Sequence, residues 1–224
     1  MDIKAYVDRL VDEAVAGSRA LAQSSGGRRN DALCRMADGL LSAKDKLHEA
    51  NEEDIREAER AGLSTAMVNR LRLTDKRTRE MAEGVRQIAA LPDPVGEVMG
   101  GWVRPNGLRI QKVRVPIGVV CMIYESRPNV TADASALCLK SGNACVLRGG
   151  KEALRTNAAI HKALCAAVAE AGLDPRAIRL IETPDRAAID VLCAAEGRID
   201  VIIPRGGEAL IRAIVEKSRV PVIK

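Results

Sequence analysis

The spacing of hydrophobic residues divides the chain into a helical first part and an alternating second part. Up to about residue 94, apolar residues recur every three or four positions, which is typical of amphipathic helices. Residues suited to helix caps and stops separate these segments. The pattern predicts helices at 3–23, within 27–62, at 64–71 and at 74–91. Residues 1–99 are therefore predicted to form a helical arm that packs on the remainder of the chain, and residues 1–94 show no chemical motif.

Residues 100–115 have the features of a β-hairpin. Two short runs, 102–104 and 108–111, flank the sequence Pro105-Asn106-Gly107. Asn-Gly is preferred in a two-residue type I′ turn, so the sequence predicts a two-residue hairpin loop. An exposed hairpin beside a helical arm often joins subunits, and we therefore expect an oligomer contact here.

After residue 115, short apolar runs alternate with helical segments. The runs at 117–123, 144–147, 178–181, 199–203 and 220–223 are predicted strands. Asn129 or Thr131 can cap the first intervening helix, and Thr183 with Pro184 can begin a later one. Five strands alternating with four helices indicate an α/β fold, with a doubly wound, Rossmann-like parallel sheet at 116–224. The apolar positions of the first helix are Val130, Ala134, Leu137 and Cys138.

Polar loops follow the predicted strands, at the edge where such sheets bind ligands. Two of them, Arg148-Gly149-Gly150-Lys151 and Arg205-Gly206-Gly207, combine an arginine with two glycines and open a helix. Paired glycines allow close backbone approach, and a helix N-terminus favours an anion. This predicts an anion or nucleotide site, although each glycine pair can also serve only to make a tight turn. A loop that binds a ribose with a free 2′-hydroxyl usually carries an Asp or Glu to accept its hydrogen bond. The first loop is basic instead, which favours a ribose that carries a phosphate.

Composition narrows the range of partners. With one Trp, two Tyr and no Phe, the chain has few platforms for stacking on bases, and its net charge of +5 is spread among acidic residues. No nucleic acid is therefore expected. Six cysteines without a C-x-x-C pair and two histidines argue against a metal site and against disulfides. No apolar run approaches the ~20 residues of a membrane span and no secretion signal is apparent, so we expect a cytoplasmic chain without a membrane partner.

A nucleophile is not apparent in the sequence. Cys121 lies within an apolar run and is predicted to point into the core. Ser126 has no histidine near it in the sequence. Four further cysteines lie at apolar positions, where buried thiols are unreactive (Cys138, Cys145, Cys165 and Cys193). The residues alone therefore predict binding without an obvious reactive group.

Several runs together resemble the γ-glutamyl phosphate reductase family, which belongs to the aldehyde dehydrogenase superfamily. The most specific run is Tyr-Glu-Ser-Arg-Pro-Asn-Val-Thr at 124–131. The others are at 93–96, 115–119, 137–144, 147–152, 203–207 and 218–223. The resemblance covers essentially the whole chain.

The resemblance implies a reaction and residues that perform it. The family reduces L-glutamyl 5-phosphate with NADPH to L-glutamate 5-semialdehyde, the second step of proline biosynthesis. A cysteine expels phosphate, and the resulting thioester accepts hydride. Asn129 matches the asparagine whose amide stabilises the oxyanion. The loop 148–151 matches the one that meets the adenosine ribose and its phosphate. Arg205-Gly206-Gly207 is also assigned to the cofactor, with Gly206 and Gly207 near the pyrophosphate.

The resemblance also bears on substrate and partners. It assigns Glu125 and Arg127 to the substrate carboxylate, implies a homo-oligomer, and raises glutamate 5-kinase as a candidate partner. In this family the nucleophilic cysteine lies a short way beyond the last predicted strand. The sequence therefore resembles an amino-terminal portion without the catalytic domain, and we expect the 224 residues alone to be inactive. Two alternatives stay open: a non-catalytic nucleotide-binding or assembly module, and another acyl-reducing member of the superfamily, for example one that uses coenzyme A.

Overall fold

Helices occupy most of the first 90 residues, as the apolar spacing predicts. In the computed structural model, which describes residues 2–125 and 127–224, they are α1 (Ile3–Ala22), α2 (Gly26–Ser42), α3 (Lys44–Arg60), α4 (Thr65–Leu71) and α5 (Asp75–Ala90). The predicted caps Ser64 and Thr74 accept hydrogen bonds from the backbone N–H groups of Met67 and Arg77. The long segment expected within 27–62 is divided in two at Ala43.

The second part alternates strands and helices. Its elements are β3 (Val119–Tyr124), α6 (Asn129–Lys140), β4 (Ala144–Arg148), the 3-10 helix η1 (Lys151–Ala153), α7 (Leu154–Glu170), the 3-10 helix η2 (Pro175–Ala177), β5 (Ile178–Leu180), α8 (Ala187–Cys193), β6 (Val201–Arg205) and α9 (Glu208–Lys217). The strands form a parallel sheet in the order β5-β4-β3-β6, so β3 is paired on both sides. This confirms the predicted α/β fold with a parallel sheet.

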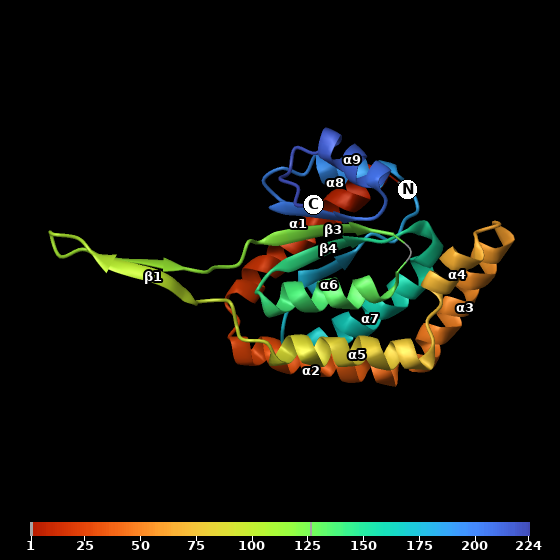
Figure 1. Cartoon of the computed structure of the whole chain (residues 1–224), viewed down its shortest axis with the longest axis horizontal. Helices are drawn as coiled ribbons and strands as arrows, with labels where there is room; N and C mark the ends of the chain where they lie inside the picture. Colours follow the sequence, from red (N-terminus) through yellow and green to blue (C-terminus); the bar gives the residue numbers. More distant parts are fainter. Residues whose placement is uncertain (1, 126) are drawn as a thin grey trace.

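Helices cover both faces of the sheet (Figure 1). α6 and α7 pack on one face, α1 and α8 lie on the other, and α9 packs against β6. α2 and α5 form a further layer outside α6 and α7. One hydrophobic core joins these layers, since it includes Val11 of α1, Met36 of α2, Val85 of α5 and Val146 of β4. The arm thus shares its core with the sheet, while the domain limits at 99 and 116 stay a prediction.

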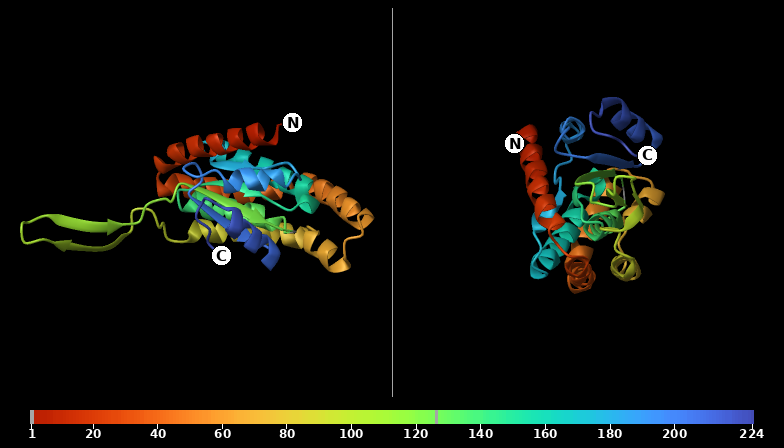
Figure 2. Two further views of the ribbon diagram at one scale, coloured as in Figure 1. Left: turned by 90° about the horizontal axis from the view of Figure 1, so that it is seen from above. Right: turned by 90° about the vertical axis from the view of Figure 1, so that its left-hand side faces the viewer.

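The predicted hairpin projects far from the other elements (Figures 1 and 2). It consists of β1 (Val98–Val103) and β2 (Arg109–Val113), which pair antiparallel. The predicted two-residue loop is wrong. The Gly107 N–H donates to the Arg104 carbonyl at 2.9 Å, so Pro105 and Asn106 are central and Gly107 follows with a φ of 83°. The proline ring fixes its own φ near about −65°, which suits the first central position and shifts the turn by one residue.

The beginning and end of β3 also differ from the prediction. Ile117, expected in the strand, is 57% exposed. The Ile117 and Gly118 N–H groups donate to Asn143 Oδ1 at 2.6 and 2.9 Å, so a side chain and not a neighbouring strand satisfies them. Tyr124, expected in the loop, is the buried last residue of β3.

The first turn of α6 shows why its predicted caps are wrong. Pro128 occupies the N-cap position without a side-chain bond, so neither Asn129 nor Thr131 caps the helix. The Thr131 hydroxyl is engaged elsewhere, with Tyr124 and with α7. Leu137, one of the four apolar positions of this helix, is 51% exposed.

Two elements near the C-terminus are shorter than predicted. The strand expected at 220–223 is reduced to a single bridge between Ile202 and Val222. Pro221 has no N–H to donate, which limits pairing at that point. α8 begins at Ala187, beyond the expected start at Thr183, because a separate turn precedes it.

Candidate functional site

The carboxyl ends of the parallel strands meet at one edge of the sheet, around a cavity of about 660 Å³. Four residues predicted from the sequence line it: Glu125, Arg148, Gly150 and Lys151. Its volume lies within the range of about 300–1,000 Å³ common for small-molecule sites. We call it the first cavity. Helices α4, α8 and α9 complete its walls, through residues that include Met67, Arg70, Ile189 and Leu210.

Arg148 ends β4 and connects two loops of this edge. Its side chain is buried, with Nη1 donating to the Gly149 carbonyl at 2.9 Å and Nη2 to the Pro184 carbonyl at 3.2 Å. Burial lowers the pKa of Arg148. Its Nε is also buried and has no hydrogen-bond partner in the described part of the chain. Arg148 therefore ties the loop after β4 to the loop after β5 and leaves one donor unused.

Packing requires the two glycines after Arg148. A Cβ on Gly149 would overlap the Asn157 amide and crowd the Tyr124 ring. A Cβ on Gly150 would overlap the Glu152 carboxylate. Lys151 is exposed at the first position of η1 and lines the first cavity. Lys151 is thus the residue of this loop whose charge is open to a ligand.

A carboxylate from the neighbouring strand end lies at the N-terminus of α9. Glu125 Oε2 accepts the Gly207 N–H at 2.9 Å, and a Cβ on Gly206 would overlap this carboxylate. The contact is favourable because the first N–H groups of a helix have no intrahelical partner and carry partial positive charge. The Glu125 carboxylate therefore occupies the position at the N-terminus of α9 that the resemblance assigns to the pyrophosphate of the cofactor. Arg205 is the exposed last residue of β6 and lies outside the lining of the first cavity.

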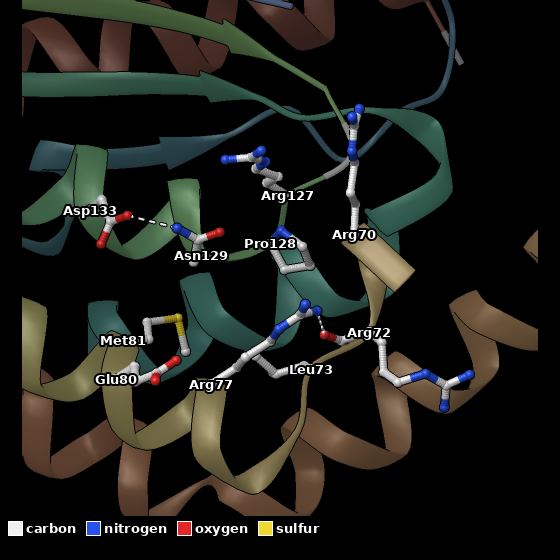
Figure 3. A pocket seen from close by; sticks show the side chains of 10 residues that line it. All are labelled: Arg70, Arg72, Leu73, Arg77, Glu80, Met81, Arg127, Pro128, Asn129 and Asp133. Atoms are coloured by element: carbon white, nitrogen blue, oxygen red, sulfur yellow. Dashed lines mark hydrogen bonds between the residues drawn. The ribbon is translucent and has the colours of Figure 1, made fainter. Parts of the chain in front are cut away.

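A second cavity, of about 350 Å³, lies beside the loop between β3 and α6 (Figure 3). Arg127 and Asn129 line it, whereas Glu125 lines the first cavity, so the structure separates the two residues assigned together to the substrate. Asn129 Nδ2 donates to Asp133 Oδ2 at 2.8 Å. Burial raises the pKa of Asp133, and this hydrogen bond opposes the shift. An amide nitrogen carries two hydrogens, so Asn129 keeps one for another acceptor.

A buried hydrogen-bond network fixes the start of α6. The Tyr124 hydroxyl lies 2.6 Å from Thr131 Oγ1, which donates to Asn157 Oδ1 at 2.9 Å. Since the one hydroxyl hydrogen of Thr131 goes to Asn157, Tyr124 is the donor to Thr131. Burial raises the pKa of Tyr124, which keeps its proton in place. The network joins β3, α6 and α7 and so positions Asn129, two residues before Thr131.

The chain matches known proteins along nearly all of its length. Residues 3–224 match the aldehyde dehydrogenase family. The chain belongs to this family. Aldehyde dehydrogenases use nicotinamide cofactors and act on small molecules, which agrees with a ligand site at the carboxyl edge of the sheet.

The similar proteins include several γ-glutamyl phosphate reductases. One from Caldanaerobacter subterraneus subsp. tengcongensis is 50% identical over 97% of this chain and 53% of its own length. One from Thermodesulfovibrio yellowstonii is 47% identical over 100% of this chain and 54% of its own length. A crystal structure of the Thermotoga maritima protein has a TM-score of 0.96 at 37% identity, over 97% of this chain and 53% of that one. The predicted resemblance is confirmed, and the chain spans about half the length of the curated relatives it matches.

The cysteines of this aldehyde dehydrogenase chain that show a pKa shift are poor nucleophiles. Burial raises the pKa of Cys121 and Cys193, and raises that of Cys165 to about 11. The pKa of Cys145 is raised by its contact with the Cys138 thiol and by burial. These thiols stay protonated near neutral pH, as their apolar positions predict. Ser126 lies outside the described residues.

Cys165 has a histidine neighbour that the sequence did not indicate. Its Sγ lies 3.2 Å from His161 Nε2, which also lies 3.1 Å from the Ile178 carbonyl. A carbonyl only accepts, so Nε2 carries a proton and cannot take one from the thiol. Burial also lowers the pKa of His161. The pair is therefore not an activated Cys-His arrangement.

The described residues contain neither a cluster of side chains that could bind a metal ion nor a helix that could span a membrane. Over 2–125 and 127–224, no three His, Cys, Asp or Glu side chains gather as a metal site would require. No helix in the same ranges has the length and apolar character needed to cross a bilayer.

The sequence analysis did not predict that α4 and α5 contribute residues to the second cavity. Arg70, Arg72 and Arg77 all line the second cavity, although residues 1–94 show no chemical motif. The available signal was charge density, since residues 70–79 contain four arginines and a single acidic residue. Helical periodicity does not show which end of a helix meets a distant loop, so this signal could not be connected to Asn129.

Proposed function

We propose that the chain forms the cofactor-binding part of an enzyme that reduces L-glutamyl 5-phosphate to L-glutamate 5-semialdehyde and releases phosphate. The observation that carries this proposal is 47% identity along all 224 residues with a γ-glutamyl phosphate reductase. NADP as the particular nicotinamide cofactor and a cytoplasmic location are parts of the same proposal.

The residues of the first cavity fit a phosphorylated dinucleotide. Lys151 is exposed there, and Arg148 keeps a buried Nε without an acceptor in the described residues. Positive side chains on this loop suit the 2′-phosphate of NADP. The Gly207 N–H, which donates to Glu125 in this structure, is proposed to turn to the pyrophosphate. When bound, the cofactor supplies the hydride of the reduction.

Asn129 is proposed to stabilise the oxyanion that forms when the acyl carbon is attacked. Its contact with Asp133 fixes the amide, because a carboxylate accepts only from the nitrogen side. The second hydrogen on Nδ2 is then available to a negatively charged oxygen in the second cavity. A preorganised donor of this kind favours the transition state because no reorientation is needed during the reaction.

The nucleophilic cysteine is proposed to lie outside these 224 residues. Raised pKa values at Cys121, Cys145, Cys165 and Cys193 support this assignment. The purified 224-residue chain should therefore not oxidise NADPH in the presence of L-glutamyl 5-phosphate. Turnover that depends on both compounds would contradict the assignment.

Calorimetric titration of the chain with NADPH and NADH tests the cofactor proposal. NADPH should bind more tightly, and Lys151→Ala should weaken it about tenfold, because one charge-assisted contact contributes about 1.5–3 kcal/mol and 1.4 kcal/mol is tenfold. NADH binding should change less than about twofold, since it lacks the 2′-phosphate. Lys162→Ala, on the exposed side of α7, is the matched control. Equal affinity for both dinucleotides, or no effect of Lys151→Ala, would refute the assigned role.

The hairpin is proposed to join subunits of a homo-oligomer. All six residues of β1 are exposed, including Trp102 and Val103. Large apolar side chains gathered on a projecting element favour burial against another chain. Light scattering should report an oligomer that Trp102→Lys weakens, and a monomer at every concentration would refute this. Glutamate 5-kinase stays a proposed partner, for which the same measurement on a mixture is the test.

A further inference from the structure

Two helices in the second part of the chain are capped by carboxylates that come from other elements. Asp54 of α3 accepts hydrogen bonds at the start of α7, from the Thr156 N–H at 2.8 Å and the Arg155 N–H at 3.3 Å. Glu125, which follows β3, accepts the Gly207 N–H at the start of α9. Neither helix has a side-chain hydrogen bond from its own N-cap residue. Each carboxylate therefore binds N–H groups at the positive end of a helix.

The two capping carboxylates differ in how firmly they are held. Asp54 is 2% exposed and also accepts the Thr156 hydroxyl at 2.7 Å, so it is a fixed part of the protein interior. Glu125 is exposed, and among the described residues its carboxylate accepts one hydrogen bond, at 2.9 Å. No basic side chain within 2–125 and 127–224 forms an ion pair with it. A single exposed contact at a helix N-terminus contributes little free energy, so another anion can displace the Glu125 carboxylate.

Only the side chain of Glu125 has to move for this exchange. Its backbone N–H donates to the Arg205 carbonyl at 3.2 Å, next to the paired residues Tyr124 and Arg205, so the end of β3 stays attached to β6. The carboxylate lies against Gly206, where an added Cβ would overlap it, whereas an added Cβ at Gly207 would meet open space. The carboxylate and a phosphate group cannot both bind here, because both are negatively charged and both need the same N–H group.

The first cavity carries more positive than negative charge. Five basic and three acidic members of the described residues line it (Arg70, Arg148, Lys151, Arg186 and Lys217; Glu125, Glu152 and Asp190). Arg148 is 8% exposed, and its Nε is buried without a hydrogen-bond partner in the described part of the chain. Lys217 is paired with Asp190 at 2.9 Å. The remaining positive charge favours a ligand with more than one anionic group, which a single carboxylate cannot replace.

We infer that Glu125 is an internal competitor of the nicotinamide dinucleotide. In the free chain its carboxylate occupies the Gly207 N–H, and the pyrophosphate has to displace it before the dinucleotide can bind at the start of α9. The dinucleotide prevails because it also reaches Lys151 and Arg148, whereas Glu125 offers a single charge. Glu125 thereby lowers the affinity for any such dinucleotide and does not affect smaller nucleotides that do not reach α9. This inference rests on the proposed function, and it adds a residue that sets the affinity for the cofactor.

Titration of the 224-residue chain with NADPH, NADH and 2′-AMP tests the inference. Glu125→Gln keeps the length of the side chain and an oxygen that can accept the Gly207 N–H, so it removes only the charge. NADPH and NADH should both bind this variant about fivefold more tightly, as the loss of a carboxylate from a helix N-terminus implies. The affinity for 2′-AMP, which has the phosphorylated ribose but no pyrophosphate, should change less than about twofold.

Glu208→Gln is the matched control. It removes the same charge from the first residue of α9, where Glu208 is 84% exposed and pairs with Arg212 at 2.7 Å. Glu208 lies outside the lining of the first cavity. The affinity of this variant for NADPH should therefore differ from that of the parent chain by less than about twofold.

The outcomes separate this inference from the proposed function. Unchanged or weaker binding of NADPH and NADH by Glu125→Gln would refute the competition and leave the cofactor proposal standing. An equal gain in Glu208→Gln, or an equal gain for 2′-AMP, would show that only net charge matters and would overturn the assignment. Equal affinity of the parent chain for NADPH and NADH refutes the preference for NADP, while tighter binding of both by Glu125→Gln still supports the competition. If neither the parent chain nor Glu125→Gln binds a dinucleotide, both proposals are refuted.

Discussion

Asn51 holds the connection between α4 and α5 from the protein interior. It lies on α3 at 1% exposure. Its Nδ2 donates to the Leu71 carbonyl at 2.9 Å and to Thr156 Oγ1 at 3.2 Å, and its Oδ1 accepts the Leu73 N–H at 2.7 Å. These bonds fix the backbone on both sides of Arg72, beside the second cavity. Asn51→Ala should therefore destabilise the chain and loosen this wall.

The size of the effect follows from the groups left behind. The Leu71 carbonyl and the Leu73 N–H belong to buried residues and lose their partner. The Thr156 hydroxyl keeps its bond to Asp54 at 2.7 Å and loses little. An unsatisfied buried polar group costs about 1–3 kcal/mol, so two such groups give about 2–4 kcal/mol once partial hydration through the new space is allowed for.

Urea unfolding followed by circular dichroism measures this loss. Glu52→Ala is the control on the same helix, because Glu52 is 68% exposed and pairs only with Arg56 among the described residues. The control should change the free energy of unfolding by less than about 0.5 kcal/mol. If Asn51→Ala matched the control, the buried hydrogen bonds would not be what holds this connection, and the reasoning would be wrong.

Gly149→Ala should destabilise the chain by about 1–3 kcal/mol in thermal unfolding, because the added Cβ overlaps buried groups. Gly207→Ala is the control, since a Cβ there has open space and should reduce the stability less. Equal losses of stability in the two variants would contradict this prediction. His161 gives a pH-dependent prediction. Its pKa is lowered by burial from 6.5, so the fold favours the neutral ring, and the stability this contributes is present above about pH 6.5 and is lost as the pH falls. The free energy of unfolding should therefore fall between pH 7.5 and 5 less steeply in His161→Gln than in the parent chain, and identical slopes would exclude the burial of His161 as a cause.

Local sequence signals predicted the elements that depend on local chemistry. Helical spacing and the caps Ser64 and Thr74 located α4 and α5, and the alternation after residue 115 located the strands of the sheet. The loops at the carboxyl edge followed from the rule that ligands bind where parallel strands end. Lys151 and Arg148 were found in this way, and both line the first cavity.

Features that depend on distant contacts could not be predicted in the same way. Gly149 looked like a residue for a ligand, but its packing against Asn157 and Tyr124 involves three elements. Glu125 looked like a substrate contact, and its hydrogen bond to Gly207 depends on β3 and β6 being neighbours. Arg70 reaches both cavities only because α3 and α4 dock beside η1. Such contacts arise from the order of strands and the packing of helices, which no short window of sequence contains.

The two ends of the hairpin segment lie close together, so the hairpin could be replaced by another segment without disturbing the rest of the chain. A Cβ on Gly142 would touch the side chains of both Val95 and Pro116, so the chain leaves and re-enters the body across a single glycine. Asp93 is fixed by Arg29 at 2.8 Å on the outgoing side, and Ile117 is fixed by Asn143 on the returning side. A short linker could therefore replace the hairpin with little loss of loop-closure entropy and no change to the core. Changes in the hairpin can therefore alter the proposed subunit contact without affecting the cavities, so the proposed surface for partners and the proposed surface for ligands are free to diverge separately.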